Sequence, residues 1–341
     1  MIPDAEVVVT LSEEGYIKRT PLVEYRTQNR GGVGSKGVGS KDNDFTRHLF
    51  IATNHNYLLF FTKFGKIFWL KTYKVPEGSK TAKGRPLQNL IQIDHEDRVQ
   101  AVINVPTLTE EAFVQSRFLV MATEKGIIKK TSLEAYSRPR QNGINAININ
   151  EGDRLLDVKL TNGESDIMLA VRSGRAIRFN ETAVRAMGRV STGVRGVALD
   201  DENDRVVGMV CVSDDASNIL VVSEKGFGKR SEVEEYRITN RGGKGVKTMG
   251  VTEKTGEIIS IKNVVDSDEL MLITRAGIAI RMAVESLRVM GRATQGVRLM
   301  RLNEGDSISS IAKIERIEEV ANDASQGQNE EGGAEDLSDE S

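Results

Sequence analysis

The sequence is poor in the residues that disulfide-bonded, membrane-spanning and single-strand-binding proteins need. Its one cysteine, Cys211, excludes an internal disulfide and is typical of a reducing compartment. No apolar run approaches the roughly 20 residues that a bilayer-spanning helix requires. Aromatic residues make up 5% of the chain and are not interleaved with the cations, as they are in proteins that stack single-stranded bases. We therefore expect a cytoplasmic protein with no membrane partner.

Patterns typical of enzymes and metalloproteins are also missing. The three histidines show no metal-ligand spacing with Cys211 or with one another. The Gly-Ser-Lys order at 34–36 and 39–41 differs from the Gly-Lys-Ser/Thr order of a Walker loop, and no helical pattern follows it. We therefore expect no catalytic residue, no metal ion and no cofactor in this chain.

The charge of the chain is unevenly distributed. The formal net charge is −2, from 47 Lys and Arg against 49 Asp and Glu. Residues 321–341 contain seven acids and no base, which leaves 42 acids against 47 bases in residues 1–320, a net charge of +5. A basic body with an acidic tail suggests a polyanionic partner for which the tail competes. A solubilising tail on an ordinary surface is the alternative.

One sequence unit recurs six times along the chain. Each copy has a short apolar run, a turn ending in glycine and a second run ending in a cation, as in LVMATEKGIIKK and LMLITRAGIAIR. The runs are too short and too β-branched for helices, and the glycine supplies the positive φ of a tight turn, so each copy predicts a β-hairpin. The turn glycines are Gly15, Gly65, Gly126, Gly174, Gly226 and Gly277.

A second glycine follows the first by 17 or 19 residues in every copy, and further apolar runs come after it. Each unit therefore holds about four strands, and six such units predict an all-β, six-bladed ring of the propeller type. We expect this ring to span residues 1–318 and an acidic disordered tail to span 319–341. A β-solenoid and a pair of sandwiches are the alternatives, but solenoid coils are usually shorter and sandwiches do not repeat six times.

Cations recur at equivalent places in the units and would form a belt around such a ring. The fourth residue after the turn glycine is Trp69 in one copy and a cation in the others, at Arg19, Lys130, Arg178, Arg230 and Arg281. More cations lie near the second glycine, at Arg30, Lys83, Arg85, Arg138, Arg140, Arg189, Arg195, Arg241, Lys244, Lys247, Arg292 and Arg298. Polar outer strands of mixed charge are the alternative, yet the first position holds no acid.

The cations favour duplex DNA as the polyanion. No helix-turn-helix or zinc-finger pattern offers an element that reads bases, so the inventory suits phosphate contacts. The stretch QNRGGVGSKGVGSK in the first copy predicts a loop whose glycines let backbone N–H groups approach phosphates. We expect DNA contacts there from Gln28, Asn29, Arg30, Gly31, Gly32, Val33, Gly34, Lys36 and Lys41.

Several segments together resemble the C-terminal DNA-wrapping domain of the DNA gyrase A subunit, over nearly the whole chain from Val7 to about Ile317. They are GYIKRTPLVEYRTQNRGG, KTAKGRPLQNLI, VRAMGRVSTGVRGV and VMGRATQGV. The glycine-rich stretch is similar to the family's box, Gln-Arg-Arg-Gly-Gly-Lys-Gly, with Asn29 and Val33 in place of two cations. A second copy of this box, TNRGGKG, stands at 239–245.

The resemblance implies a β-pinwheel, in which neighbouring blades exchange strands and double-stranded DNA wraps around the rim. The wrap would present a positive crossover to a heterotetrameric holoenzyme that introduces negative supercoils at the expense of ATP. The partners implied are the gyrase B subunit, which carries the ATPase, and the remainder of the gyrase A subunit, which carries the cleaving tyrosine, in the bacterial cytoplasm with the nucleoid. The isolated domain would be a monomer. The equivalent domain of topoisomerase IV and a propeller scaffold for a protein partner are the alternatives.

Overall fold

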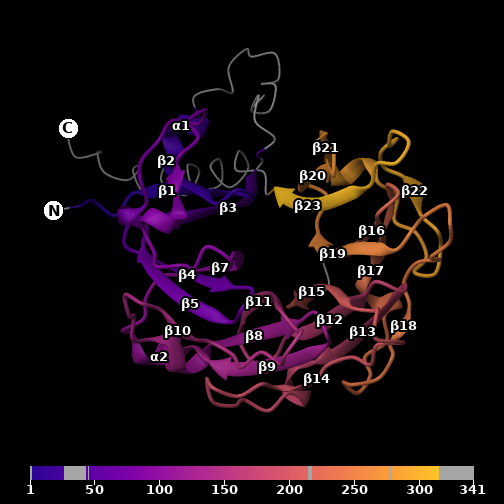
Figure 1. Ribbon diagram of the computed structural model, residues 1–341, viewed down its shortest axis with the longest axis horizontal. Helices are drawn as coiled ribbons and strands as arrows, with labels where there is room; N and C mark the ends of the chain where they lie inside the picture. The colour runs from indigo at the N-terminus through magenta and orange to yellow at the C-terminus, as the bar shows by residue number, and fades with distance from the viewer. Residues whose placement is uncertain (1, 27–43, 45, 214–216, 277, 315–341) are drawn as a thin grey trace, which may run out of the picture.

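The structure is a ring of six antiparallel β-sheets, as the repeats predicted (Figure 1). It is a computed structural model that describes residues 2–26, 44, 46–213, 217–276 and 278–314. The blades run around the ring in sequence order, and β23 of the last blade lies against β3 of the first. The expected six-bladed propeller architecture is therefore confirmed.

Each of the first five blades has four strands in the described residues, and the sixth has three. From the axis outward, blade 1 consists of β3 (Thr46–Thr53), β1 (Glu6–Ser12), β2 (Tyr16–Pro21) and β6 (Arg85–Pro86). Blade 2 consists of β7 (Val99–Val105), β4 (Tyr57–Thr62), β5 (Lys66–Lys71) and β10 (Ile144–Asn145). Blade 3 consists of β11 (Leu155–Thr161), β8 (Phe118–Thr123), β9 (Ile127–Ser132) and β14 (Val194–Arg195). Blade 4 consists of β15 (Val206–Val212), β12 (Asp166–Val171), β13 (Arg175–Asn180) and β18 (Val246–Lys247). Blade 5 consists of β19 (Ile258–Val264), β16 (Asn218–Ser223), β17 (Phe227–Glu232) and β22 (Val297–Arg298). Blade 6 consists of β23 (Ile308–Ile314), β20 (Glu269–Thr274) and β21 (Ala279–Ala283).

Only short helices occur in the described residues. The α-helices are α1 (Leu22–Arg26) and α2 (Glu111–Ser116), and the 3-10 turns are η1 (Thr72–Lys74), η2 (Leu87–Asn89), η3 (Leu133–Tyr136), η4 (Glu181–Ala183), η5 (Val233–Glu235) and η6 (Val284–Ser286). No described helix is long and apolar enough to cross a membrane.

Neighbouring blades exchange strands, as the resemblance implied. The two-residue strand β6 follows the hairpin of blade 2 in sequence but pairs with β2 of blade 1, where Ile17 lies opposite Arg85. The strands β10, β14, β18 and β22 join the preceding blade in the same way and lie at the outer edge of the ring (Figure 1). Each outer strand is therefore supplied by the next repeat.

The second glycine of each unit is required by this exchange. Gly84 has φ +88°, and a Cβ atom there would lie 2.6 Å from the carbonyl oxygen of Ile17 in the preceding blade. Gly143, Gly193, Gly245 and Gly296 also have positive φ and approach the preceding blade equally closely. Only glycine combines that backbone conformation with such a close approach. The 17–19-residue spacing in the sequence therefore marks where each unit crosses to its neighbour.

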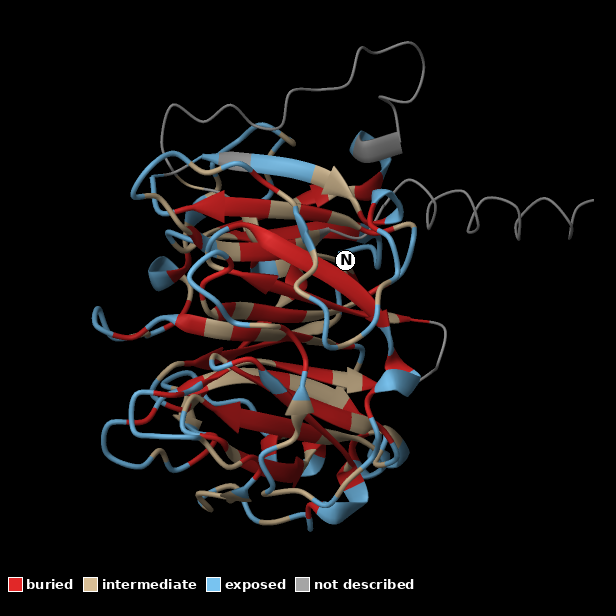
Figure 2. Cartoon of the chain, turned by 90° about the vertical axis from the view of Figure 1, so that its right-hand side faces the viewer, coloured by how far each residue is buried: buried red, intermediate tan, exposed pale blue. Residues whose placement is uncertain are grey.

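The hydrophobic core is divided among the interfaces between blades. One cluster packs blade 1 on blade 2, around Phe60 and Phe68, and another packs blade 2 on blade 3, around Phe61 and Tyr136. Further clusters join blades 3 and 4, blades 4 and 5, and blades 5 and 6. Buried residues follow the strands, and exposed residues gather on the connecting loops (Figure 2). The sheets of blades 2 to 5 therefore bury both faces, which leaves their loops and outer strands for contacts with a partner.

Candidate nucleic-acid interface

The first predicted cation position, four residues after the turn glycine, is interior in three blades. Lys130, Arg178 and Arg230 are 6%, 9% and 7% exposed, because each side chain inserts between its own blade and the next repeat. Three isolated backbone bridges run from these same residues to the following repeat. The expectation that they form part of an exposed belt is therefore wrong in these blades.

Each of these cations donates to a carbonyl oxygen near a 3-10 turn of the next repeat. Arg178 Nη1 lies 2.8 Å from the oxygen of Val233, and its Nε lies 2.9 Å from Asp166 Oδ2. Arg230 Nε lies 2.6 Å from the oxygen of Leu287. A carbonyl oxygen has two lone pairs, so Val233 can accept from Arg178 while it also accepts from the backbone N–H of Tyr236 within the turn.

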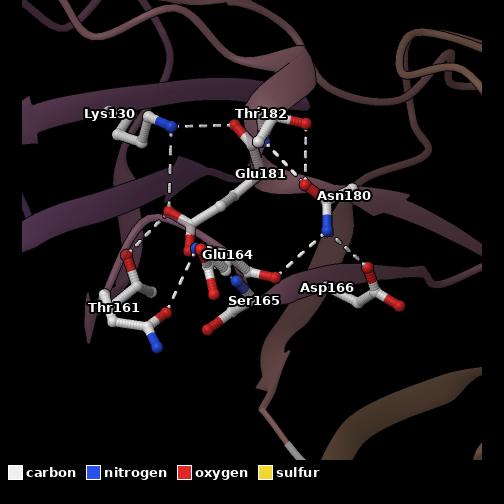
Figure 3. Close-up of polar contacts among 9 residues, drawn as sticks. Lys130, Thr161, Glu164, Ser165, Asp166, Asn180, Glu181 and Thr182 are labelled. Atoms are coloured by element: carbon white, nitrogen blue, oxygen red, sulfur yellow. Dashed lines mark hydrogen bonds and ion pairs between the residues drawn. The ribbon is translucent and has the colours of Figure 1, made fainter.

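Lys130 makes the corresponding contact with Glu181 (Figure 3). Its Nζ lies 3.0 Å from the Glu181 carbonyl oxygen and 3.9 Å from its carboxylate. That carboxylate is fully buried and also accepts hydrogen bonds from the Thr161 hydroxyl and the Ser165 backbone N–H, both at 2.7 Å. The buried charges are paired and hydrogen-bonded, as burial of an ion pair requires.

The remaining members of the first position differ in exposure. Arg19 donates to the carbonyl oxygen of Val75 at 2.9 Å and to Glu77 at 2.8 Å, with a side chain 17% exposed. Trp69 fills the position in blade 2 and donates its Nε1 to the carbonyl oxygen of Tyr136 at 2.9 Å. Arg281 of blade 6 is half exposed and pairs with Glu269 of its own sheet. Five of the six side chains at this position thus share one property, which is a hydrogen-bond donor that reaches the next repeat. Within the described residues, Arg281 does not make such a contact.

Three buried lysines that sequence reasoning missed precede this position in alternate blades. Lys18 Nζ donates to the carbonyl oxygens of Ser79, Lys80 and Ala82, at 2.9, 2.7 and 2.7 Å. The equivalent Lys129 donates to Ala146 and Arg189, and Lys229 donates to Gly291 and Arg292. Burial lowers the pKa of Lys129 to about 7 and that of Lys229 to about 8. A recurring lysine beside the predicted cation was the signal in the sequence.

These lysines fix the loops that carry the second set of predicted cations. Lys18 holds the loop that leads to Arg85, Lys129 holds the loop of Arg189, and Lys229 holds the loop of Arg292. The carbonyl oxygens of each loop accept from the buried ammonium group, which fixes the course of the loop backbone. An interior cation thus shapes a surface loop on the next repeat.

Most of the second set is exposed, at the outer edge of the ring. The exposed members are Lys83, Arg85, Arg138, Arg140, Arg195, Lys244, Lys247 and Arg298, and Arg189, Arg241 and Arg292 are partly buried. Arg85, Arg195, Lys247 and Arg298 occupy the outer strands β6, β14, β18 and β22. Only β10, which carries Asn145, lacks a cation among the outer strands of the described residues. The structure therefore brings one exposed cation to the outer strand of four blades. Arg195, Lys247 and Arg298 share the same register, and Arg85 lies one residue earlier in its strand.

Successive outer strands are tied together by arginines. Arg189 Nη1 donates to the carbonyl oxygen of Asn145 at 2.8 Å, and Arg241 Nη1 donates to that of Arg195 at 3.1 Å. Arg292 makes the same contact with the carbonyl oxygen of Lys247. Each of these bonds therefore joins one repeat to the outer strand of the previous repeat.

Other predicted contacts lie outside the described residues. These are Gln28, Asn29, Arg30, Gly31, Gly32, Val33, Gly34, Lys36 and Lys41 of the first box, together with the acidic tail at 319–341. The second box is described, and its Lys244 forms an ion pair with Asp200 at 3.0 Å. In the described part of the chain, no group of three His, Cys, Asp or Glu side chains is placed to hold a metal ion.

Comparisons with known proteins agree with this architecture. The family model "DNA gyrase C-terminal domain, beta-propeller" matches six consecutive segments, at residues 6–53, 56–106, 117–162, 165–213, 217–264 and 268–315. The DNA gyrase A subunit of Staphylococcus epidermidis (strain ATCC 12228) is 44% identical over 315 residues, and that of Staphylococcus aureus (strain MRSA252) is 40% identical over 336 residues. These alignments cover 92% and 98% of this chain but only 35% and 37% of the two relatives.

Two solved structures share the fold. A crystal structure of the C-terminal domain of DNA topoisomerase IV superposes with a TM-score of 0.79 and 24% identity, covering 96% of this chain and 99% of that one. A structure of the DNA gyrase A C-terminal domain gives a TM-score of 0.70 and 24% identity, covering 91% and 99%. With the six matched segments falling on the six blades, this chain belongs to the DNA gyrase C-terminal beta-propeller family.

Proposed function

We propose that this chain binds duplex DNA along the outer edge of the ring and bends it around that edge. The observation that carries the proposal is the exposed cation on four equivalent outer strands, at Arg85, Arg195, Lys247 and Arg298. A curved row of cations suits the phosphate backbone, whose charges repeat along the duplex whatever the base sequence. Bending a site of 20–30 base pairs costs roughly 1–6 kcal/mol, which several phosphate contacts offset at moderate salt.

Within DNA gyrase, we propose that the bent duplex forms a positive crossover, which ATP-dependent strand passage converts into negative supercoils. The partners are then double-stranded DNA, the gyrase B subunit, and the remainder of the gyrase A subunit, in the bacterial cytoplasm. The 40–44% identity to the gyrase A subunits of the two staphylococci supports this assignment. DNA cleavage and ATP hydrolysis would reside in the other parts of the enzyme, and this chain would act without a catalytic site.

We further propose that the first box anchors the DNA at one end of the edge and that the outer strands carry it onward. The ring would then occupy residues 1–318, and the acidic tail at 319–341 would compete with DNA for the same cations. This arrangement follows from the charge split of +5 in residues 1–320 against seven acids in the tail.

A second candidate is the topoisomerase IV type of domain, which the TM-score of 0.79 favours at the level of the fold. Such a domain would support relaxation or decatenation without strong wrapping. To separate the two candidates, the chain is joined to the rest of the gyrase A subunit, the gyrase B subunit is added, and plasmid topology is assayed. Negative supercoils in the presence of ATP support the gyrase assignment, and relaxation alone contradicts it.

DNA binding itself is tested by titrating duplex DNA at a series of salt concentrations. Each neutralised phosphate contributes about 0.9 to the slope of log K against log salt, so a belt of several contacts gives a steep slope. A slope of about one or two contacts would contradict the belt, and salt-insensitive binding to a protein would favour a scaffold role instead.

A further inference from the structure

The innermost strands bring a second group of basic side chains to the ring axis, away from the outer strands proposed to bind DNA. His48 lies on β3, Lys159 on β11, Lys262 on β19 and Lys313 on β23, and these strands face the centre of the ring (Figure 1). We call these four residues the axial cluster. They come from blades 1, 3, 5 and 6, so the fold brings them together although they are up to 265 residues apart.

Two lysines of the axial cluster have acidic partners. Lys159 Nζ lies 3.4 Å from Asp157 Oδ2, and Lys313 Nζ lies 3.6 Å from Asp268 Oδ2. Nearby, Arg47 pairs with Glu13 at 3.5 Å. Lys262 has no hydrogen bond and no ion pair among the residues that the structure describes. The axis therefore carries one lysine without an ion-pair partner in the described residues, and Asp157 compensates its charge only in part.

The surroundings of Lys262 make this charge costly. Lys262 is partly exposed, yet desolvation by the surrounding protein lowers its pKa to about 8. The positive charges of Lys159, Arg47 and Lys313 also lower this pKa, and the negative charge of Asp157 raises it. A group with that pKa is still mostly protonated at pH 7. Burying a charge without a counter-charge is unfavourable, so a partner for this ammonium group would stabilise the ring.

His48 supplies the second polar group of the axial cluster that lacks a partner in the described residues. Its Nε2 is buried without a hydrogen-bond partner in the structure. Burial, with smaller effects from Arg47, Lys262 and Lys159, lowers the pKa of His48 to about 3, so the imidazole is neutral and can donate through one ring nitrogen. Buried polar groups in native proteins almost always have partners, and an ion or water explains most exceptions.

We infer that the ring axis binds a small inorganic anion of the phosphate class at Lys262, with His48 as a second hydrogen-bond donor. The anion compensates the Lys262 charge and accepts hydrogen bonds from the two groups that lack partners. Because Lys262 and His48 belong to blades 5 and 1, the anion would join the last part of the ring to the first. This inference does not depend on DNA binding, since it concerns the opposite edge of each blade.

The inference is tested by thermal unfolding of the 341-residue chain in inorganic phosphate and in chloride at constant ionic strength. Phosphate is expected to raise the Tm of the wild type, with saturation, and to release or absorb heat in a calorimetric titration. Lys262→Met should abolish both responses while leaving the Tm in chloride no lower, because it removes a desolvated charge that has no ion-pair partner in the described residues. Lys74→Met, which alters an exposed lysine away from the axis, should respond like the wild type.

Two results would overturn the inference. An equal rise in Tm for Lys262→Met and the wild type would place the phosphate effect elsewhere on the protein. A wild type that gives no heat and no rise in Tm would mean that water alone occupies the axis. If Lys262→Met fails to fold, Lys262→Gln serves as the second variant, and His48→Gln should weaken phosphate binding without abolishing it.

Discussion

The indole nitrogen of Trp69 donates to the carbonyl oxygen of Tyr136 across the interface between blades 2 and 3, at 2.9 Å. In the two neighbouring interfaces, Arg19 and Lys130 at the equivalent position make such a contact, with the carbonyl oxygens of Val75 and Glu181. A tryptophan cannot contact a phosphate as a cation does, but it supplies one N–H donor. The common role of the position is therefore to join consecutive blades.

Replacing Arg178 with Met should strongly destabilise the ring. The change removes the hydrogen bonds to Val233 and Tyr236 and leaves Asp166 without its cation in a nearly buried site. Loss of one partner of a buried pair costs about 3–5 kcal/mol, which urea unfolding would measure.

The matched control is Arg281→Met, which changes the same position in blade 6. Its side chain is half exposed, and its one partner among the described residues is Glu269 on its own sheet, so a loss below about 1 kcal/mol is expected. Similar losses for both variants would contradict the assignment of Arg178 to the interface between blades.

The buried Lys129 should make stability depend on alkaline pH. Its pKa is about 7 in the fold, against 10.5 ordinarily, and burial is the main cause, followed by the charge of Arg189. Between pH 7 and pH 10.5, Lys129 is protonated in the unfolded chain but largely neutral in the fold. The contribution of Lys129 to the free energy of unfolding therefore rises with pH in this range. This contribution is smallest below about pH 7 and is fully gained as pH approaches 10.5.

Comparing the wild type with Lys129→Met isolates this effect. The difference in unfolding free energy, wild type minus variant, should increase from about pH 7 to about pH 10 in urea titrations. Lys125→Met, an exposed lysine in the adjoining turn, should run parallel to the wild type. A constant difference between the wild type and Lys129→Met would show that Lys129 does not titrate in this range.

The four exposed cations on the outer strands should set the salt dependence of DNA binding. Changing Arg85, Arg195, Lys247 and Arg298 together to Ala should lower the slope of log K against log salt by about 3–4, at about 0.9 for each lost phosphate contact. The variant should keep its stability, because Arg241 and Arg292 bond to backbone oxygens of this edge that alanine retains.

The control for this variant changes exposed arginines beside the innermost strands. Arg154 and Arg205 directly precede β11 and β15, so Arg154→Ala with Arg205→Ala alters net charge without touching the outer strands. If the control lowers the slope as much per residue as the outer-strand variant does, net charge and not a defined edge would account for the binding.

The features that sequence predicted correctly are those that depend on local backbone requirements. A turn glycine such as Gly126, with φ +84°, and the β-branched runs beside it specify a hairpin without help from distant residues. The exposure of Lys130 and Arg230 was predicted wrongly, because each is covered by the next repeat through strand exchange. That contact joins residues of different repeats, and only the tryptophan at 69 indicated that the position serves something other than phosphate.

The two boxes should differ in their importance for wrapping. In the second box, Arg241 already donates to the carbonyl oxygens of Ala183 and Arg195, and Lys244 pairs with Asp200. We therefore expect Lys244→Ala to reduce wrapping only slightly, whereas Arg30→Ala with Lys36→Ala should abolish the topological change that the chain produces in a nicked and religated minicircle. Intact wrapping in the double variant would move the anchor away from the first box.

The acidic tail should weaken DNA binding at low salt and lose this effect at high salt. Its seven acids act on the cations of residues 1–320 through charge, and exposed charges are screened beyond a Debye length of about 10 Å at 0.1 M salt. Removing residues 321–341 should therefore raise affinity several-fold in dilute buffer and leave it nearly unchanged near about 0.5 M salt. A full-length variant with the seven acids changed to Asn and Gln separates charge from length, because it should match the truncated chain. Equal affinity of the wild type and both variants in dilute buffer would mean that the tail does not compete with DNA.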